Sequence, residues 1–146
     1  MLLITIPGTG YYSDLLTKSE IGNVRRFPSA NQLCSYAGLV PSTYASGNTS
    51  YHGHITKQGS RWLLWILIEV AIHAVKRTGP LRRFYFKVEK RKEGKVAKVA
   101  TARKLLEWIY HMMRDGKTFK EVEKSVELLG KGELAKKPGL CFRPSI

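Results

Sequence analysis

The sequence predicts a mainly α-helical domain, built of helix-hairpin-helix elements with a Ser/Gly-rich loop or short β-hairpin between its core helices. Three observations predict it. Apolar residues recur at helical spacing in several segments. Glycine, proline and serine stand at the ends of those segments. One internal segment, residues 42–60, shows no 3.6-residue period and is rich in Ser, Thr and Gly. The 146 residues suit one domain, which we place at 1–120, followed by a short charged helix and a flexible tail at 121–146.

The N-terminal segment has the layout of a helix-hairpin-helix module. An apolar helical turn leads into Pro7-Gly8-Thr9-Gly10, and a second helix is predicted over Tyr11–Ile21, closed by Gly22. Glycines at Gly8 and Gly10 would let backbone N–H groups approach a DNA phosphate, because no Cβ stands in the way. A plain helix-loop-helix turn fits these residues equally well.

The next two helices are predicted from their ends. Ser29 is a suitable N-cap for a helix over Ala30–Ala37, and Gly38 ends it. Ser60 is placed to cap a helix over Trp62–Val75. That helix is apolar nearly all round, so we expect it to run through the core.

The second half predicts three more helices. Pro80 opens a helix over 81–92, and Gly94 interrupts the pattern before a strongly amphipathic helix over 96–114, closed by Asp115-Gly116. The apolar stripe of this second helix consists of Val99, Ala102, Leu106, Ile109 and Met113. A short charged helix follows at 121–129, and the chain from about Gly130 has little to bury, so we expect it to be poorly ordered.

The charge of the chain predicts a polyanionic partner. There are 25 Lys and Arg against 11 Asp and Glu, a net charge of +14. Residues 76–120 hold 15 of those cations and 4 of the acids, so this segment carries +11 of the total. Nucleic acid is the usual partner of such a surface. Membrane binding is the rival use, but the longest apolar run, 62–72, is interrupted by Glu69 and is too short to span a bilayer.

The sequence gives two signs of an intracellular protein. The N-terminus lacks the basic region and cleavage site of a signal peptide. Cys34 and Cys141 lie far apart without metal-ligand spacing, so they are interpreted as reduced thiols. We therefore expect a cytoplasmic location and no membrane partner.

The acids and histidines do not predict a metal or acid–base site. The candidate carboxylates are scattered, so we interpret them as solvated helix charges; they are Asp14, Glu20, Glu69 and Asp115. His52 and His54 are two residues apart, but no third ligand stands nearby, so we interpret them as polar loop residues. No cofactor is expected in this chain.

The Ser/Gly-rich segment is the place where phosphate chemistry is conceivable. A Ser followed by Gly can present its hydroxyl on a sharp turn, and Lys57 and Arg61 could neutralise a phosphate. A serine nucleophile also needs a neighbouring base or cation. Most Ser/Gly-rich segments are ordinary loops, so the residues alone support only a loop suited to phosphate.

The order of motifs resembles the C-terminal domain of the transposases of insertion sequences 110, 116 and 902, an RNA-bridged serine recombinase-like family. Members commonly show runs similar to L-L-x-I-P-G-I-G, E-I-G-D, R-F-x-S-x-x-Q-L-x-x-Y-A-G-L-V-P, Ser-Gly-Gly, G-x-I-x-K-x-G and A-R-K-L-L. The matching segments are Leu2–Gly10, Glu20–Asn23, Arg26–Pro41, Ser46–Asn48, Gly53–Gly59 and Ala102–Leu106. The resemblance extends from residue 1 to about residue 120.

This resemblance implies a serine nucleophile that joins covalently to DNA, and Ser46 is the matching position. It also implies an N-terminal RuvC-like domain with four metal-binding acids, which nothing here matches, so a divalent metal would belong to that domain. Met1 directly precedes the hairpin motif, and the sequence therefore resembles a truncated reading frame or an isolated C-terminal domain. Asn48 and Thr49 stand where the family often has Gly and Lys, which removes one cation beside the serine.

Two main hypotheses follow. In the first, the chain is a serine-type transposase domain in which Ser46 attacks a phosphodiester. The residues expected to contact DNA are Gly8, Gly10, Lys57, Arg61, Arg82, Arg83, Lys87, Lys90, Arg91, Lys95 and Lys98. In the second, it is a truncated, non-catalytic nucleic-acid-binding remnant with the same surfaces. DNA is the expected partner, with a guide RNA and a second copy of the chain as further candidates. A structural helical protein on an acidic partner or a membrane is a weaker third hypothesis.

Overall fold

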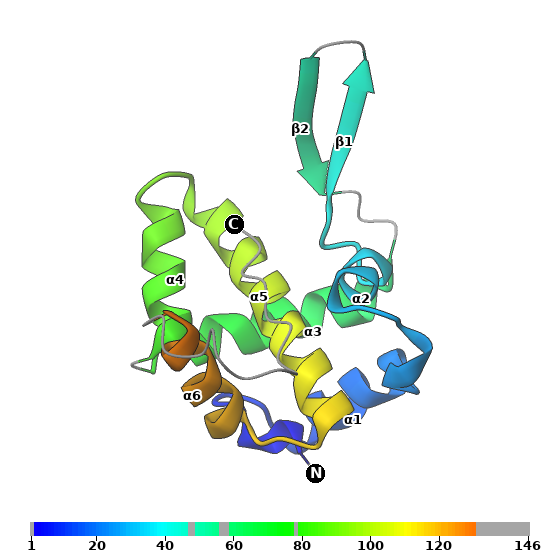
Figure 1. The fold of residues 1–146 in the computed structure, drawn as a ribbon, viewed down its shortest axis with the longest axis vertical. Coiled ribbons are helices and arrows are strands. Elements are labelled where there is room, and N and C mark those ends of the chain that lie inside the picture. The colour runs from blue at the N-terminus through cyan, green and yellow to red at the C-terminus, as the bar shows by residue number, and fades with distance from the viewer. Residues whose placement is uncertain (1, 47–48, 56–58, 78, 131–146) are drawn as a thin grey trace.

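The computed structural model describes residues 2–46, 49–55, 59–77 and 79–130, and they form a mainly helical body, as the sequence predicted (Figure 1). The elements in chain order are η1 (Leu3–Thr5), α1 (Tyr11–Ile21), η2 (Val24–Arg26), α2 (Ala30–Tyr36), β1 (Pro41–Ser46), β2 (Thr49–Ile55), α3 (Arg61–Val75), α4 (Pro80–Glu89), α5 (Gly94–Asp115) and α6 (Phe119–Gly130). The expected disorder after Gly130 and the second cysteine, Cys141, lie outside the described residues.

The two strands pair with each other, in the segment where the sequence left a loop or a hairpin open. β1 and β2 are antiparallel, with Pro41 opposite Ile55 at the base and Ser46 opposite Thr49 at the far end. The hairpin projects away from the helical body (Figure 1). After β2 the chain lies close to the end of α2 at Gly59. Glycine allows this approach, because a Cβ built there would lie 2.2 Å from the Tyr36 carbonyl oxygen.

The predicted helix ends at three places are confirmed, and each has a local cause. The Ser29 hydroxyl accepts a hydrogen bond from the Gln32 N–H at 3.4 Å, and Ser60 does the same for the Leu63 N–H at 3.3 Å. Gly116 ends α5 with a φ of 65°, a conformation that glycine adopts without strain.

The predicted roles of α3 and α5 are wrong in part. α5 packs against α2, α3, α4 and α6, and lies across the middle of the body (Figure 1). It is buried beyond its predicted stripe, since Leu105, Trp108 and Met112 are all at most 1% exposed. In contrast, α3 is not buried all round, because Trp62 and Trp65 are 62% and 49% exposed. Of these two helices, α5 has the more polar sequence, and yet it is the one at the centre of the body.

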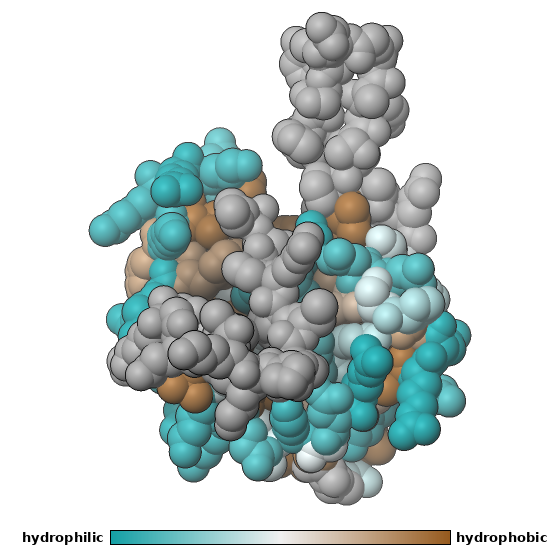
Figure 2. Space-filling model, viewed as in Figure 1, coloured by the Kyte–Doolittle hydropathy of each residue, from teal (hydrophilic) through white to brown (hydrophobic). Residues whose placement is uncertain are grey.

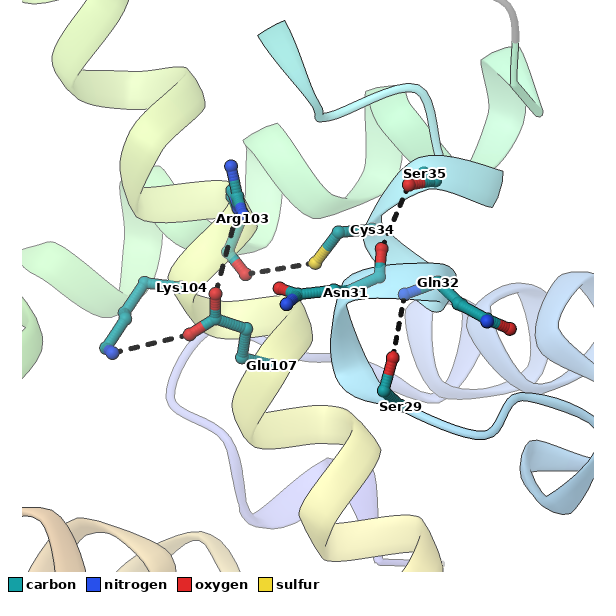
Figure 3. Close-up of polar contacts among 8 residues, drawn as sticks. All are labelled: Ser29, Asn31, Gln32, Cys34, Ser35, Arg103, Lys104 and Glu107. Atoms are coloured by element: carbon teal, nitrogen blue, oxygen red, sulfur yellow. Dashed lines mark hydrogen bonds and ion pairs between the residues drawn. The ribbon is translucent and has the colours of Figure 1, made fainter. Parts of the chain in front are cut away.

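The interpretation of the acids as solvated helix charges is wrong for Asp14. Its side chain is fully buried in α1, where one oxygen lies 3.0 Å from the Lys18 ammonium. Glu107 of α5 is also nearly buried, between Arg103 at 3.7 Å and Lys104 at 3.3 Å (Figure 3). A buried acid is usually accompanied by a cation in this way, because burial of an unpaired charge is costly. Both are structural ion pairs of the helix to which they belong.

Cys34 is a buried thiol, on the face of α2 that meets α5 (Figure 3). Its Sγ lies 3.9 Å from the Arg103 carbonyl oxygen. Burial, followed by the nearby Glu107 charge, raises the pKa of this thiol to about 12. The thiolate is the reactive form, so the folded protein should keep Cys34 inert.

We expect Cys34 to resist alkylation in the native state. In a Cys141→Ser variant, iodoacetamide at about pH 8, near the ordinary pKa of a free thiol, should add no mass to the folded protein. The same reagent in denaturant should add one adduct. Native labelling at the rate of a free thiol would contradict the buried position of Cys34.

Candidate functional site

The two hairpin glycines have different surroundings. Gly8 has a φ of +87°, and a Cβ built on it would lie 2.3 Å from the Cβ of His73 on α3. Gly10 has a φ of −88°, and nothing lies within 4 Å of a Cβ built there. Gly8 therefore lets the turn at residues 7–10 pack against α3, whereas Gly10 leaves open space beside the start of α1.

No described side chain caps the start of α1. Gly10 is the N-cap residue and offers no side chain to cap the helix. Tyr11 and Tyr12 follow it, and both side chains are exposed. Unsatisfied N–H groups at a helix N-terminus attract anions. The segment before the turn at residues 7–10 is a single 3-10 turn, η1. The predicted helix-hairpin-helix module therefore contains one full α-helix, α1.

Ser46 and Arg61 lie towards opposite ends of the β-hairpin formed by β1 and β2. Ser46 is the last residue of β1, and Arg61 is the exposed first residue of α3, beyond the base of β2. A strand of seven residues is about 20 Å long, at about 3.3 Å per residue. Lys57 and the residues between the strands, 47–48, lie outside the described residues. The structure thus does not bring Arg61 close to Ser46.

The remaining predicted cations gather at one corner of the molecule. We define the basic corner as Arg82, Arg83, Lys87, Lys90, Arg91, Lys95 and Lys98. They lie on α4, on the turn after it and on the first turns of α5, two helices that pack together, and all seven are exposed. In Figure 2 this edge of the molecule shows hydrophilic residues around a hydrophobic area. In Figure 1 the turn after α4 and the start of α5 lie towards the end of the molecule from which the β-hairpin projects.

Two arginines of the basic corner have partners within the protein. The Arg83 guanidinium forms an ion pair with Glu127 of α6 at 2.7 Å. Arg82 donates to the Lys76 carbonyl oxygen at 3.3 Å, which leaves its charge uncompensated. Among the described residues, neither Lys87 nor Lys90 forms an ion pair with an acid. The corner therefore keeps most of its positive charge.

Sequence reasoning missed Phe86. This ring is 42% exposed and lies among the cations of α4, four residues from Arg82 and from Lys90. The signal was present in that spacing, because residues four apart share one face of a helix.

Comparison with known proteins identifies the family. The model of the Transposase IS116/IS110/IS902 family matches residues 1–86. The chain belongs to this family. The matched part runs from the glycine hairpin through β1, β2 and α3 to most of α4. It therefore includes Ser46 and the first two residues of the basic corner, Arg82 and Arg83.

Curated relatives extend the similarity beyond that part. An "Insertion element IS110 uncharacterized 43.6 kDa protein" from Streptomyces coelicolor is 33% identical over 82% of this chain and 30% of its own length. An "Insertion element IS116 uncharacterized 44.8 kDa protein" from Streptomyces clavuligerus is 30% identical over 81% of this chain and 30% of its own length. A "Transposase for insertion sequence element IS1111A" from Coxiella burnetii is 36% identical over 46% of this chain and 18% of its own length. The chain thus spans at most about a third of these relatives.

Two kinds of feature are absent from the described part of the chain. None of its helices has both the length and the apolar composition of a membrane span. No three His, Cys, Asp or Glu residues of that part are grouped so that they could hold a metal ion.

Proposed function

We propose that this transposase-family chain binds DNA, with the basic corner as its main contact surface. The observation that carries the proposal is the gathering of seven exposed cations where α4 meets the start of α5. Phosphates bound by such a surface release counterions, so binding weakens steeply as salt rises. The open N-terminus of α1 at Gly10 supplies a second contact for a phosphate.

Ser46 is the proposed nucleophile. Its place at the end of β1, where the hairpin projects from the body, suits a group that must reach a DNA backbone. In the reaction, the Ser46 oxygen forms a bond to phosphorus and a bridging P–O bond breaks. The hydroxyl proton passes to solvent, and the departing oxygen takes up a proton as the strand end leaves. No energy-rich cofactor is consumed, because the phosphoserine ester conserves the bond for strand exchange.

The alternative is a non-catalytic nucleic-acid-binding domain. The separation of Ser46 from Arg61 favours it, because Arg61 was one of the two cations predicted to steady the phosphate and lies beyond the other end of the β-hairpin. In this case the basic corner and α1 would hold DNA, or a guide RNA, while other protein or a second copy of the chain completes the reaction.

A DNA-binding series tests the proposal. The affinity for duplex DNA should fall steeply with salt. Replacing Lys87 and Lys90 by glutamine should flatten the slope of log affinity against log salt by up to about 2, since each lost phosphate contact removes about 0.9. The matched control replaces two exposed lysines of α6, Lys120 and Lys124, and makes the same change in net charge. Equal effects of the two pairs would show that only net charge matters and would remove the basic corner as a specific surface.

The nucleophile is tested in the same samples. A denaturing gel should show a covalent protein–DNA adduct for the wild type and none for Ser46→Ala, while the two proteins bind DNA equally. An adduct that survives Ser46→Ala would rule out Ser46. DNA binding with no adduct in either protein would favour the non-catalytic alternative.

A further inference from the structure

The outer face of α4 combines one aromatic ring with four cations. Arg82, Phe86 and Lys90 follow one another at intervals of four, and Arg83 and Lys87 lie beside them. This stripe is about 12 Å long, since an α-helix rises about 1.5 Å per residue. A surface hollow runs along it, lined by these five residues and Gly79.

The Phe86 ring is held in a defined position. Tyr85 meets it edge to face, with ring centroids 5.4 Å apart at an interplanar angle of 83°. The Arg82 guanidinium carbon lies 5.3 Å from the Phe86 centroid, which is a cation–π distance. The Tyr85 hydroxyl is turned to Glu89 at 3.1 Å, so that acid is engaged by the tyrosine. The Phe86 ring therefore offers a partly open surface beside positive charge.

A ring in such a setting suits unpaired bases. In a duplex the faces of the bases are covered by their neighbours, so a phenylalanine on a helix surface finds phosphates and base edges but no face to stack on. In a single strand each base offers a face to an aromatic side chain, while the backbone follows a basic groove. We infer that the α4 stripe, centred on Phe86, binds a single-stranded segment of nucleic acid.

This inference rests on the proposed function, because it assumes that the basic corner binds nucleic acid, and it adds the strandedness of the ligand. The shared chemistry is an unpaired base above a charged backbone. That ligand is supplied by DNA opened during strand exchange or by an RNA, and the two sources differ in sugar and not in the stacking contact with Phe86.

Fluorescence anisotropy with three labelled probes of about 20 nucleotides tests the inference: oligo-dT, oligo-U and a mixed-sequence duplex. Phe86→Ala should weaken the binding of a single-stranded probe by about 5- to 150-fold, the range that base–aromatic stacking supports. Duplex binding should change less than twofold. Phe86→Trp should retain single-strand binding, and Phe86→Leu should not restore it, because leucine is apolar but cannot stack as an aromatic ring does. Trp65→Ala removes an exposed ring of α3 outside the basic corner and should leave all three affinities unchanged.

The outcomes separate this inference from the proposed function. Loss with oligo-U alone assigns the stripe to RNA, loss with oligo-dT alone assigns it to DNA, and loss with both supports the shared chemistry. Equal loss of duplex and single-strand binding, or no loss in either, overturns the inference while DNA binding stands. Failure of the wild type to bind any of the three probes overturns the proposed function itself.

Discussion

Trp108→Ala is expected to lower the free energy of unfolding by about 3–5 kcal/mol, the largest effect we expect of a core substitution in this chain. Trp108 is 1% exposed on α5, and its ring lies 5.5 Å from the ring of Phe119 at the start of α6. Truncation would open a cavity between the central helix and α6 that backbone movement could fill only in part. The indole N–H has no hydrogen-bond partner among the described residues, so its removal leaves no acceptor unpaired there. Urea unfolding followed by far-ultraviolet circular dichroism measures the change.

Val96→Ala is the matched control, because Val96 lies on the same helix and is 43% exposed. It should change the free energy of unfolding by less than about 0.5 kcal/mol. If α5 had the single buried stripe that its sequence pattern predicts, Trp108 would face outwards, and the two variants would then be similar. That result would contradict the central position of α5.

The helix ends could be predicted from the sequence because their causes are local. Ser29 and Ser60 cap the helices that follow them, and Gly116 takes the left-handed conformation that ends α5. Each of these interactions joins residues a few positions apart, so the order of residue types already contains it.

Burial could not be predicted in the same way, because it depends on how many helices surround each one. The apolar residues of α3, which include Trp62 and Trp65, predicted a core helix. No described helix covers these two tryptophan side chains, and both are exposed. Glu107 is a charged residue of α5, yet it is buried beside Arg103 and Lys104 of the same helix. Apolar periodicity records the buried stripe of a helix but not its neighbours.

The candidate site, too, was predictable where its causes are local and not where they depend on tertiary packing. The basic corner was predicted as a set of cations because most of them follow each other along α4 and the turn after it. The same prediction named Lys95 and Lys98, but the packing of α4 on α5, which brings their helix beside the other cations, is a tertiary fact. The distance of Ser46 from Arg61 depends on whether the intervening chain is a compact loop or an extended hairpin, and its residues allow both.

Gly8→Ala is expected to lower the free energy of unfolding by about 2–4 kcal/mol. About 1–2 kcal/mol comes from the positive φ, which alanine adopts with strain, and the rest from overlap with His73 on α3. His73→Ala should not relieve the loss, because the nearest atom is the His73 Cβ, which alanine keeps. Thermal unfolding of the single and double variants measures both effects. A Gly8→Ala protein as stable as the wild type would contradict the close packing of the hairpin on α3.

Gly10→Ala is the matched partner of that variant within the same hairpin. Its φ of −88° suits alanine and a Cβ there meets nothing, so stability should fall by less than about 1 kcal/mol, the usual cost of alanine at an N-cap. The affinity for duplex DNA should fall nonetheless, because a methyl group would stand beside the amides at the start of α1 that the proposed phosphate contact uses. A drop in affinity at Gly10→Ala with an unchanged melting temperature would support that contact. Unchanged affinity would mean that the hairpin glycines serve the fold alone, through Gly8 and α3, and that DNA binding depends on the basic corner.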